Sequence, residues 1–405
     1  MVAETSRPTP FARDVVVIGG CGHVGLPLAI AFASRGLRVG IFDLSESAVA
    51  CVNSATMPFA EPDAAQALER AVAAGALVAS TDPAIVGTGE HVIVVIGTPV
   101  GEHLEPDQSA IPNAMQDCAP HFASGQILIL RSTVYPGVTA RVEKMVAGLG
   151  VDLDVAFCPE RIAEGKAMTE LFELPQIVSS RTARGMDRAS SLFRKLTPTL
   201  VPMTPEEAEL AKLFTNTWRY IKFAIANQLY MMANDRGLDF ERIRQGLALD
   251  YSRAADMPGA GFAAGPCLFK DTMQLAAFNN NNFALGHTAM AINEGLPLYL
   301  VARLEQRFDL SSMTVGILGM AFKGGSDDIR ASLSYKLKRL LVFKADRVLC
   351  TDPYVTADPD LTPLAGVLAQ ADLVIIAAPH PEYAGLQTGK PVADIWNVLG
   401  KGVVV

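Results

Sequence analysis

The chain has 405 residues, enough for two or three domains of ordinary size. Hydrophobic residues make up 50%, charged residues 19%, and glycine and proline are spread along the chain, which excludes fibrous, low-complexity and largely disordered proteins. The formal net charge of -8, with no basic stripe, argues against a nucleic-acid binder.

Cysteine and histidine are scattered along the chain. The six cysteines include no C-x-x-C pair, so we expect free thiols in a reducing compartment, with neither a disulfide framework nor a metal site. Residues 1–13 are polar and lack the apolar core of a signal peptide, and the longest apolar runs are only strand-sized. We therefore expect a cytoplasmic protein without a membrane span.

The first β-α-β unit is expected over residues 14–43. Residues 14–18 are a β-branched run typical of a buried parallel strand, a glycine-rich turn follows, and residues 27–35 read as a helix. The next strand, residues 38–42, ends at Asp43. Further strands at residues 92–96, 126–131 and 153–157, with helical patterns between them, predict a doubly wound α/β domain to about residue 203.

A long helix is expected next. Thr204 and Glu207 form a capping box, and no proline or glycine interrupts the helical pattern from Glu206 until Gly237, which corresponds to a helix of roughly 45 Å. Strand and helix patterns alternate again from residue 314. We predict two Rossmann-like domains, residues 11–203 and 309–405, joined by a helical region over residues 204–308 that begins with the long helix.

The glycine-rich turn has the spacing of a dinucleotide site. Gly20 allows a tight turn, Gly22 lets a pyrophosphate approach the backbone, and Gly25 lets the helix pack closely on the strand. Asp43 stands where a carboxylate bonds the ribose hydroxyls, which favours NAD over NADP. The alternatives are an FAD site and a nucleotide fold that has lost its cofactor.

A second chemical signal surrounds Cys267. Glycine-rich residues 258–265 lead to this cysteine, and Lys270 and Asp271 follow it. A lone cysteine is more often a small buried residue than a nucleophile. A neighbouring lysine, however, raises the thiolate fraction of a thiol.

Taken together, the chain resembles the UDP-glucose/GDP-mannose dehydrogenase family, from Val15 to about Asn397. The resemblance rests on separated motifs: Gly97-Thr-Pro99, Ser132-Thr-Val-Tyr-Pro-Gly137, Pro159-Glu-Arg-Ile-Ala-Glu164, Glu209-x-x-Lys212-x-x-x-Asn216, Gly265-Pro-Cys267-x-x-Lys-Asp271, and Leu318-Gly-Met-Ala-Phe-Lys323 leading to Asp327-Asp-Ile-Arg330. It implies two Rossmann-like domains bridged by a long helix that mediates homodimerisation. It also implies metal-independent oxidation of a sugar C6 alcohol to a carboxylate, with two NAD per turnover.

The resemblance also assigns roles to individual residues. Cys267 would be the nucleophile that forms a thiohemiacetal and then a thioester, with Lys212 and Asn216 stabilising the oxyanion. Thr133 and Asp271 would position water. Glu160 would be the base for hydrolysis, and Glu164 a supporting carboxylate.

The implied binding residues form two sets. The cofactor set is Gly20, Gly22, His23, Val24, Gly25, Asp43, Thr98, Thr133, Lys270 and Arg330. The substrate set is Glu160, Arg161, Glu164, Lys212, Asn216, Arg219, Arg253, Phe262, Gly265, Cys267, Phe322 and Lys323. The diphosphate of the sugar nucleotide needs cations, and the candidates are Lys270, Lys323, Arg330 and Arg253. The resemblance also implies that Arg253 reaches into the site of a partner subunit.

Several departures bear on the sugar. Arg161 after Glu160, together with Arg219, is similar to the branch that includes UDP-N-acetylmannosamine dehydrogenase, and Trp396 stands where UDP-glucose enzymes often have arginine. Against this, Glu164 replaces a proline of that branch, and Ala263 and Ala264 replace an expected Gly-Gly pair. We expect a UDP-N-acetylhexosamine, with UDP-glucose as the alternative.

Two other functions stay open on the same fold. One is a two-electron alcohol dehydrogenase, which would not need Cys267, Glu160 and Asn216 together. The other is a non-catalytic nucleotide-sugar binder, in which one of these residues would be expected to be missing. No membrane or nucleic-acid partner is expected.

Overall fold

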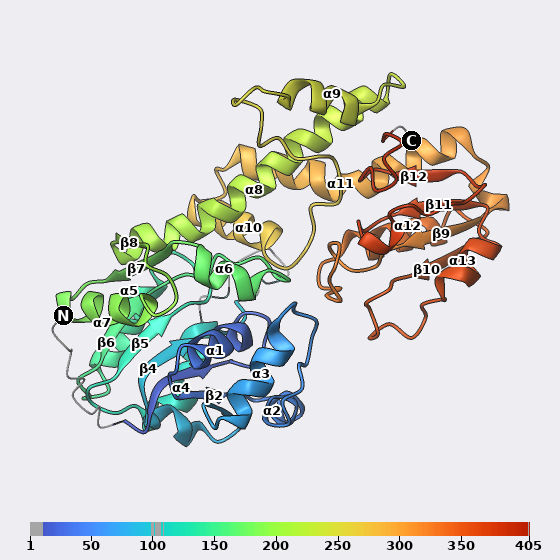
Figure 1. Ribbon diagram of the computed structural model, residues 1–405. Helices are drawn as coiled ribbons and strands as arrows, with labels where there is room; N and C mark the ends of the chain where they lie inside the picture. The colour runs from blue at the N-terminus through green and yellow to red at the C-terminus, as the bar shows by residue number, and fades with distance from the viewer. Residues whose placement is uncertain (1–10, 99–100, 102–106, 108, 404) are drawn as a thin grey trace. The chain divides into compact units, whose positions relative to one another are not determined.

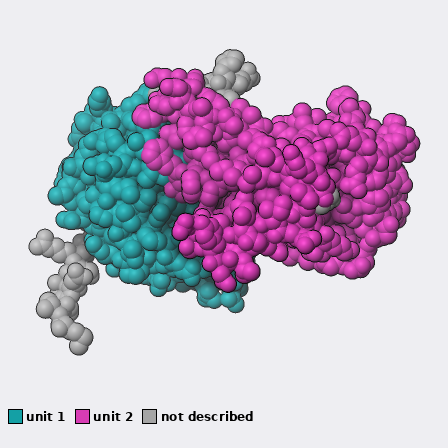
Figure 2. All heavy atoms as spheres, turned by 90° about the horizontal axis from the view of Figure 1, so that it is seen from above, with its two compact units in different colours: residues 1–213 teal, residues 214–405 magenta. Residues whose placement is uncertain are grey.

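The computed structural model describes residues 11–98, 101, 107, 109–403 and 405. The chain divides into two compact units, residues 1–213 and 214–405, which Figure 2 colours teal and magenta. Each unit is built around its own sheet. The predicted boundaries at residues 203 and 308 stay a prediction.

An eight-stranded sheet forms the centre of the first unit (Figure 1), in the order β3-β2-β1-β4-β5-β6-β7-β8. Neighbouring strands are parallel except β6 and β7, which are antiparallel. The first six strands have the order of a dinucleotide-binding doubly wound sheet, which confirms the predicted fold class for this unit. The strands are β1 (Arg13–Ile18), β2 (Val39–Phe42), β3 (Leu77–Ser80), β4 (Gly89–Val94), β5 (Ile127–Leu130), β6 (Asp154–Phe157), β7 (Gln176–Ser180) and β8 (Leu200–Met203).

Helices cover both faces of this sheet. In β1, Val15 and Val17 belong to one apolar cluster, and Val16 and Ile18 belong to the other. Burial on both faces explains why the strand reads as an unbroken β-branched run. The helices of this unit are α1 (Gly25–Ser34), α2 (Glu46–Asn53), α3 (Ala64–Ala73), α4 (Ala110–Cys118), α5 (Val138–Ala147), α6 (Ala167–Glu173) and α7 (Ala183–Phe193).

The predicted long helix is α8 (Pro205–Asn234), which has 30 residues. The expected capping box is present, because the Thr204 amide donates to Glu207 Oε2 at 2.8 Å and the Glu207 amide donates to Thr204 Oγ1 at 3.4 Å. Buried Glu209, in the second turn, accepts from the amides of Gly137 and Thr139 at 2.7 and 2.8 Å. These bonds attach the start of α8 to the start of α5 within the first unit.

The second unit begins within α8 and continues through three more helices, α9 (Phe240–Ala248), α10 (Leu268–Phe278) and α11 (Ala284–Arg307). Residues 249–267, between α9 and α10, contain neither helix nor strand. This segment carries the glycine-rich residues that lead to Cys267, so we name residues 258–266 the cysteine loop.

A four-stranded parallel sheet completes the second unit, in the order β10-β9-β11-β12. Its strands are β9 (Thr314–Leu318), β10 (Arg347–Thr351), β11 (Leu373–Ile376) and β12 (Val392–Asp394), and its helices are α12 (Leu333–Val342) and α13 (Leu364–Gln370). The chain order reverses between β9 and β11, and such a reversal is where open α/β sheets bind ligands. The predicted fold class is therefore confirmed for this unit as well.

Asp352 fixes the loop that follows β9. Its Oδ2 accepts from the amides of Met320 and Ala321 at 2.7 and 3.0 Å, and from His380 Nε2 at 3.0 Å. His380 Nδ1 in turn accepts from the Gly325 amide at 3.1 Å, so Nε2 is the donor to Asp352. Burial alone would raise the pKa of Asp352, but the bonds from His380 and the Ala321 and Tyr354 amides hold that pKa at about 2.

We predict that Asp352→Asn lowers the free energy of unfolding at pH 7 by about 2 kcal/mol. A carboxyl whose pKa is depressed on folding stabilises the protein above its unfolded pKa near 3.8, and this contribution is lost as the pH falls towards 2. Urea unfolding at pH 7, 4 and 3 should show the difference from the parent shrinking with acid. Exposed Asp360→Asn is the control, and an equal effect of the two substitutions would contradict the prediction.

Candidate active site

The glycine-rich turn of the first unit lies between β1 and α1. A Cβ on Gly25 would lie 2.7 Å from Gly20 Cα, and a Cβ on Gly20 would lie 2.8 Å from a side-chain carbon of Ile41. Packing within the chain therefore requires both glycines. A Cβ on Gly22 would meet no atom within 4 Å, so the fold does not require this glycine. Close approach of a pyrophosphate to the backbone does require it, and in this respect the residues fit NAD.

Asp43 lies at the carboxyl end of β2, beside this turn. Its Oδ2 accepts from the Cys21 amide at 2.9 Å, and its Oδ1 accepts from the Ser45 amide at 3.1 Å. The carboxylate is half-buried, and each oxygen has a second lone pair for a ribose hydroxyl. Burial, and then the charge of Asp43, raises the pKa of the Cys21 thiol to about 12, so Cys21 is no nucleophile at neutral pH.

The other predicted cofactor residues of the first unit lie in loops that follow neighbouring strands of the sheet. Val24 directly precedes α1, and the His23 ring stacks on Phe59 with ring centroids 4.0 Å apart. Thr98 follows β4, and its hydroxyl donates to the Thr133 carbonyl after β5 at 2.6 Å. The loops after β1, β2, β4 and β5 therefore share the carboxyl edge of one sheet. Pro99, which ends the Gly97 motif, lies outside the described residues.

Glu160 follows β6 at the same edge and is buried. Its Oε2 accepts from Arg131 Nε at 2.9 Å and from Arg131 Nη2, and its Oε1 accepts from the amides of Arg161 and Ile162 at 2.7 and 3.0 Å. Arg131 is fully enclosed and also donates to the Cys158 carbonyl at 2.9 Å. Removing one partner of such a buried ion pair typically costs about 3–5 kcal/mol.

Two more carboxylates hold the loop that carries Glu164. Glu61 accepts from the amides of Gly165 and Ala167, both at 2.8 Å, and Glu170 accepts from the Ala163 amide at 2.6 Å. Glu61 is buried and comes from the segment between α2 and α3. The sequence interpretation missed Glu61, Glu170 and Arg131. Only Arg131, which adjoins the Ser132 motif, had a signal nearby in the sequence.

In the second unit, Cys267 occupies the position directly before α10 and is exposed. The dipole and free amides of a helix N-terminus favour a thiolate at this place. Fully buried Asp271 lies one turn along α10, with Lys270 Nζ 3.5 Å from its Oδ1. Asn216 of α8 donates from Nδ2 to Asp271 Oδ2 at 2.5 Å. The structure thus brings Asn216, Lys270 and Asp271 together within one turn of Cys267.

The remaining predicted substrate residues of this unit have different surroundings. Gly265 has φ +98°, and a Cβ there would lie 2.6 Å from the ring of Phe322, so the cysteine loop lies directly on that ring. Lys323 Nζ lies 5.5 Å from the centre of the same ring. Arg330 donates from Nε to Asp328 Oδ1 at 2.9 Å.

The side chains of the remaining predicted residues differ in how exposed they are. In the second unit, Arg219 and Arg253 are exposed, and Phe262 is buried in the core. In the first unit, Lys212 of α8 is buried, and the Arg161 guanidinium donates to the Pro175 carbonyl. The roles of these residues stay predictions.

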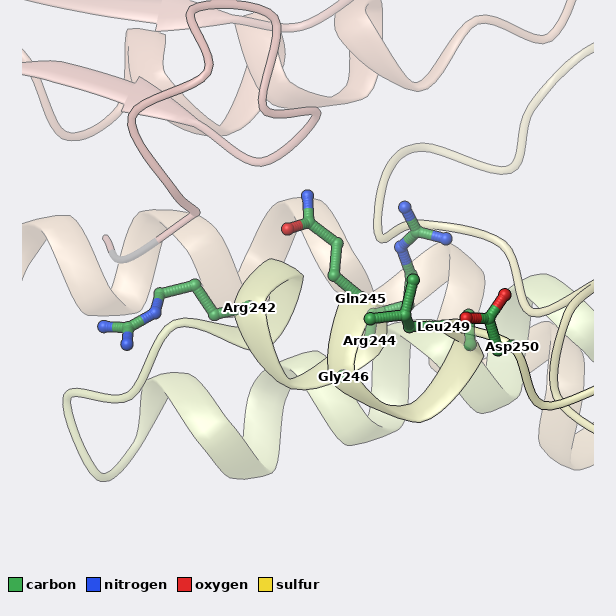
Figure 3. A pocket seen from close by; sticks show the side chains of 7 residues that line it. Arg242, Arg244, Gln245, Gly246, Leu249 and Asp250 are labelled. Carbon is green, nitrogen blue, oxygen red and sulfur yellow. The ribbon is translucent and has the colours of Figure 1, made fainter.

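A separate hollow lies on α9, as Figure 3 shows, and contains none of the predicted site residues. Its lining comprises Arg242, Arg244, Gln245, Gly246, Ala248, Leu249 and Asp250. Within the described ranges, no three His, Cys, Asp or Glu side chains gather as metal ligands would. Among the helices that the structure describes, none combines the length and apolar character needed to cross a membrane.

Comparison with known proteins finds the same family along most of the chain. Three models of the UDP-glucose/GDP-mannose dehydrogenase family match it: the NAD binding domain at residues 13–197, the central domain at 206–295 and the UDP binding domain at 316–401. A UDP-N-acetyl-D-mannosamine dehydrogenase of Pyrococcus horikoshii is 29% identical over 402 residues, which cover 96% of this chain and 93% of that protein.

Two solved structures are similar in fold. A UDP-D-ManNAc dehydrogenase from Pyrococcus horikoshii has a TM-score of 0.89 at 27% identity, covering 96% of this chain and 97% of that one. A UDP-glucose dehydrogenase from Pyrobaculum islandicum has a TM-score of 0.88 at 28% identity, covering 96% and 95%. Overall fold therefore does not separate the two sugars.

We predict opposite effects for alanine at two glycines of the β1–α1 turn. Gly22→Ala should leave thermal unfolding unchanged, because its Cβ meets no atom within 4 Å, but should weaken NAD binding at least about tenfold because the methyl blocks the pyrophosphate. Gly25→Ala should lower the unfolding temperature, because its Cβ would lie 2.7 Å from Gly20 Cα. Calorimetric NAD titration and thermal unfolding measure the two effects. Unchanged NAD affinity in Gly22→Ala would contradict the assigned site.

Proposed function

Because the chain belongs to the UDP-glucose/GDP-mannose dehydrogenase family, we propose that it oxidises the C6 alcohol of a UDP-sugar to the carboxylate in two NAD-dependent steps. As a member of this family it is an NAD-dependent nucleotide-sugar dehydrogenase. The four-electron course, the sugar and the individual residue roles are the proposal. The observation that carries it is the exposed Cys267 thiol before α10, beside the buried Asn216–Asp271 pair.

The first unit is proposed to hold NAD. Gly20, Gly22 and Gly25 would let the backbone and the start of α1 approach the pyrophosphate, and Asp43 would accept from the ribose hydroxyls. When bound, NAD supplies the hydride acceptor for each oxidation step.

Cys267 makes a four-electron course chemically reasonable. An aldehyde produced by the first oxidation is attacked by the Cys267 thiolate, which forms a C–S bond and a thiohemiacetal. Loss of a second hydride from that carbon gives a thioester, and attack by water breaks the C–S bond to release the carboxylate and the thiol. The balance is one alcohol and one water converted into one carboxylic acid, with two hydrides and two protons released.

The residues around Cys267 suit the charges that develop. Lys212 and Asn216, which stand four apart on α8, would stabilise the oxyanion on the sugar carbon. Asn216 donates from Nδ2 to Asp271 Oδ2 at 2.5 Å, so Asp271 would also orient the Asn216 amide. Asp271, together with Thr133, would position the water.

Glu160 is proposed as the base for thioester hydrolysis, with Glu164 as a supporting carboxylate. Both Glu160 oxygens already accept hydrogen bonds, two from Arg131 and two from backbone amides. Taking up a proton would therefore require one of those bonds to lengthen as the water approaches.

For the sugar, we propose a UDP-N-acetylhexosamine such as UDP-N-acetylmannosamine. The relative from Pyrococcus horikoshii carries that name at 29% identity, and Arg161 and Arg219 agree with the same branch. UDP-glucose is the second candidate, because a UDP-glucose dehydrogenase is almost equally similar in fold, with a TM-score of 0.88. The UDP binding domain model matching residues 316–401 supports the nucleotide in both cases.

We predict two NADH formed for each UDP-sugar consumed, with a uronate as the product. The measurement combines absorbance at a full turnover with mass spectrometry of products from a panel of UDP-, GDP- and TDP-sugars. One NADH per sugar, with an aldehyde or ketone as the final product, would rule out the four-electron course and leave a two-electron dehydrogenase. No turnover of any nucleotide sugar would contradict the whole proposal.

Cys267→Ser provides the matched variant. It keeps the size of the side chain but lacks a good nucleophile, so acid formation should fall by at least about 10³-fold, while NAD affinity stays unchanged because Cys267 is not among the proposed cofactor residues. Full acid formation by this variant would exclude Cys267 as the nucleophile.

We also propose a homodimer through α8. Phe214, Trp218, Ile225, Leu229 and Met232 are 37–58% exposed, and their spacing of 4, 7, 4 and 3 residues puts them on one face of the helix. A helix that exposes such a continuous apolar stripe is unusual in a protein that stays monomeric. A second copy presenting the same stripe would cover it.

We predict that Trp218→Glu combined with Ile225→Glu converts the protein to the monomer. A charge at each of two positions of the stripe would have to be buried in the dimer, which costs several kcal/mol. Light scattering after gel filtration should give 43.1 kDa for the variant and twice that mass for the parent. Phe343→Glu, at a still more exposed apolar residue after α12, is the control, and a parent that elutes as a monomer would contradict the dimer.

A further inference from the structure

Trp396 of the second unit lies directly against the backbone of Gly261 in the cysteine loop. A Cβ built on Gly261 would lie 2.4 Å from two carbons of the indole ring and 2.6 Å from a third. Gly261 also has φ +151°, a conformation that L residues rarely adopt. The ring therefore occupies the space that any side chain at position 261 would need.

Asn227 of α8 holds the same residue through its peptide groups. Its Oδ1 accepts from the Gly261 amide at 2.9 Å, and its Nδ2 donates to the Gly261 carbonyl at 3.0 Å. Asn227 is fully buried, and Nδ2 also donates to Asn293 Oδ1 of α11 at 3.0 Å. A bidentate amide contact fixes the peptide groups, and the Trp396 ring fills the side-chain position, so Gly261 has little freedom to move.

Phe322 provides a second aromatic contact four residues along the loop, where its ring packs against Gly265. The Gly265 amide donates to the Ala331 carbonyl at 3.3 Å. Two residues later the chain reaches Cys267 and the start of α10. The cysteine loop is thus fixed at both glycines by aromatic rings from the C-terminal α/β region.

Trp396 also lies at the edge of the sheet where a ligand is expected. It follows β12, and its Nε1 donates at 3.1 Å to the carbonyl of Ala377, the residue directly after β11. Phe322 follows β9, on the other side of the point where the strand order reverses. In an open α/β sheet this is the edge at which ligands bind.

We propose that Trp396 is a positioning residue for Cys267: by covering Gly261 it fixes the cysteine loop and thereby the place of the thiol at the start of α10. This role rests on the proposed function of Cys267 as the nucleophile. Trp396 acts through the loop, and no contact of its ring with substrate is needed.

Three variants of the full-length protein test this role. Trp396→Ala removes the ring, Gly261→Ala adds a methyl where the ring lies, and Trp396→Phe keeps an aromatic ring. Phe343→Ala, which removes an 87% exposed ring elsewhere in the same unit, is the matched control. Thermal unfolding shows which variants are folded. If Gly261→Ala does not fold, the comparison of Trp396→Ala with Trp396→Phe still tests whether the ring is needed.

The first measurement is the rate of iodoacetamide alkylation of Cys267, followed by peptide mass spectrometry. Cys51 of α2, which is half-buried in the first unit, serves as the internal reference in each sample. We expect the ratio of the Cys267 rate to the Cys51 rate to change about tenfold in Trp396→Ala and in Gly261→Ala, because the thiol leaves its fixed place at the helix start. Trp396→Phe should stay within about twofold of the parent, as should the control.

The second measurement is turnover with a UDP-sugar. In the two disruptive variants kcat should fall by about tenfold or more, with KM for NAD unchanged, because the glycine turn and Asp43, which are proposed to bind the pyrophosphate and the ribose, lie in the first unit. Recovery of kcat in Trp396→Phe would show that the ring itself is needed. A loss of stability alone would not separate kcat from KM in this way.

The alkylation ratio needs no substrate, so the two proposals can fail separately. If no UDP-sugar is oxidised but the ratio still changes tenfold, the proposed function is wrong and the contact between Trp396 and the cysteine loop stands. If UDP-sugars are oxidised, and folded Trp396→Ala keeps the parent's ratio and kcat, Trp396 is not a positioning residue.

Discussion

Carboxylates that accept hydrogen bonds from backbone amides hold three loops of the proposed site. Asp43 binds the turn after β1, Asp352 binds the loop after β9, and Glu61 binds the loop that carries Glu164. Each bond is between a charged acceptor and an amide, a stronger type than a bond between neutral groups. Parallel strands end at one edge of a sheet, so these loops need such bonds to stay ordered where a ligand must enter. The rest of the site depends on this ordering.

The two sheets use an aspartate after their second strand in different ways. Asp43 is half-buried and binds one amide with each oxygen, so it keeps lone pairs for a ligand. Asp352 has a fully enclosed side chain, and His380 Nε2 lies 3.0 Å from the oxygen that already binds two amides. The same position therefore keeps free lone pairs in one sheet and is used by the fold in the other.

The sequence predicted most of the local structure. The strands, the α8 capping box and the glycine turn follow from periodicity and short motifs, and the alternation of strands and helices predicted to begin at residue 314 starts where β9 starts. Pairs distant in sequence were not predictable. Glu61 binds Gly165, which is 104 residues away, and Trp396 covers Gly261 across 135 positions. No periodicity or motif spacing reports such a contact, because it depends on how complete elements pack.

Because these loops are held through their peptide groups, the side chains of the loop residues contribute little to holding them in place. The amides of Arg161, Ile162 and Ala163 are bound by glutamates, and the Gly261 amide is bound by Asn227. An amide is present on every residue except proline, so substitutions at residues 161–163 leave these bonds available, whereas Gly261 has no room for a side chain. The side chain of a residue such as Arg161 can therefore change over evolutionary time without loss of the hydrogen bond that its amide makes.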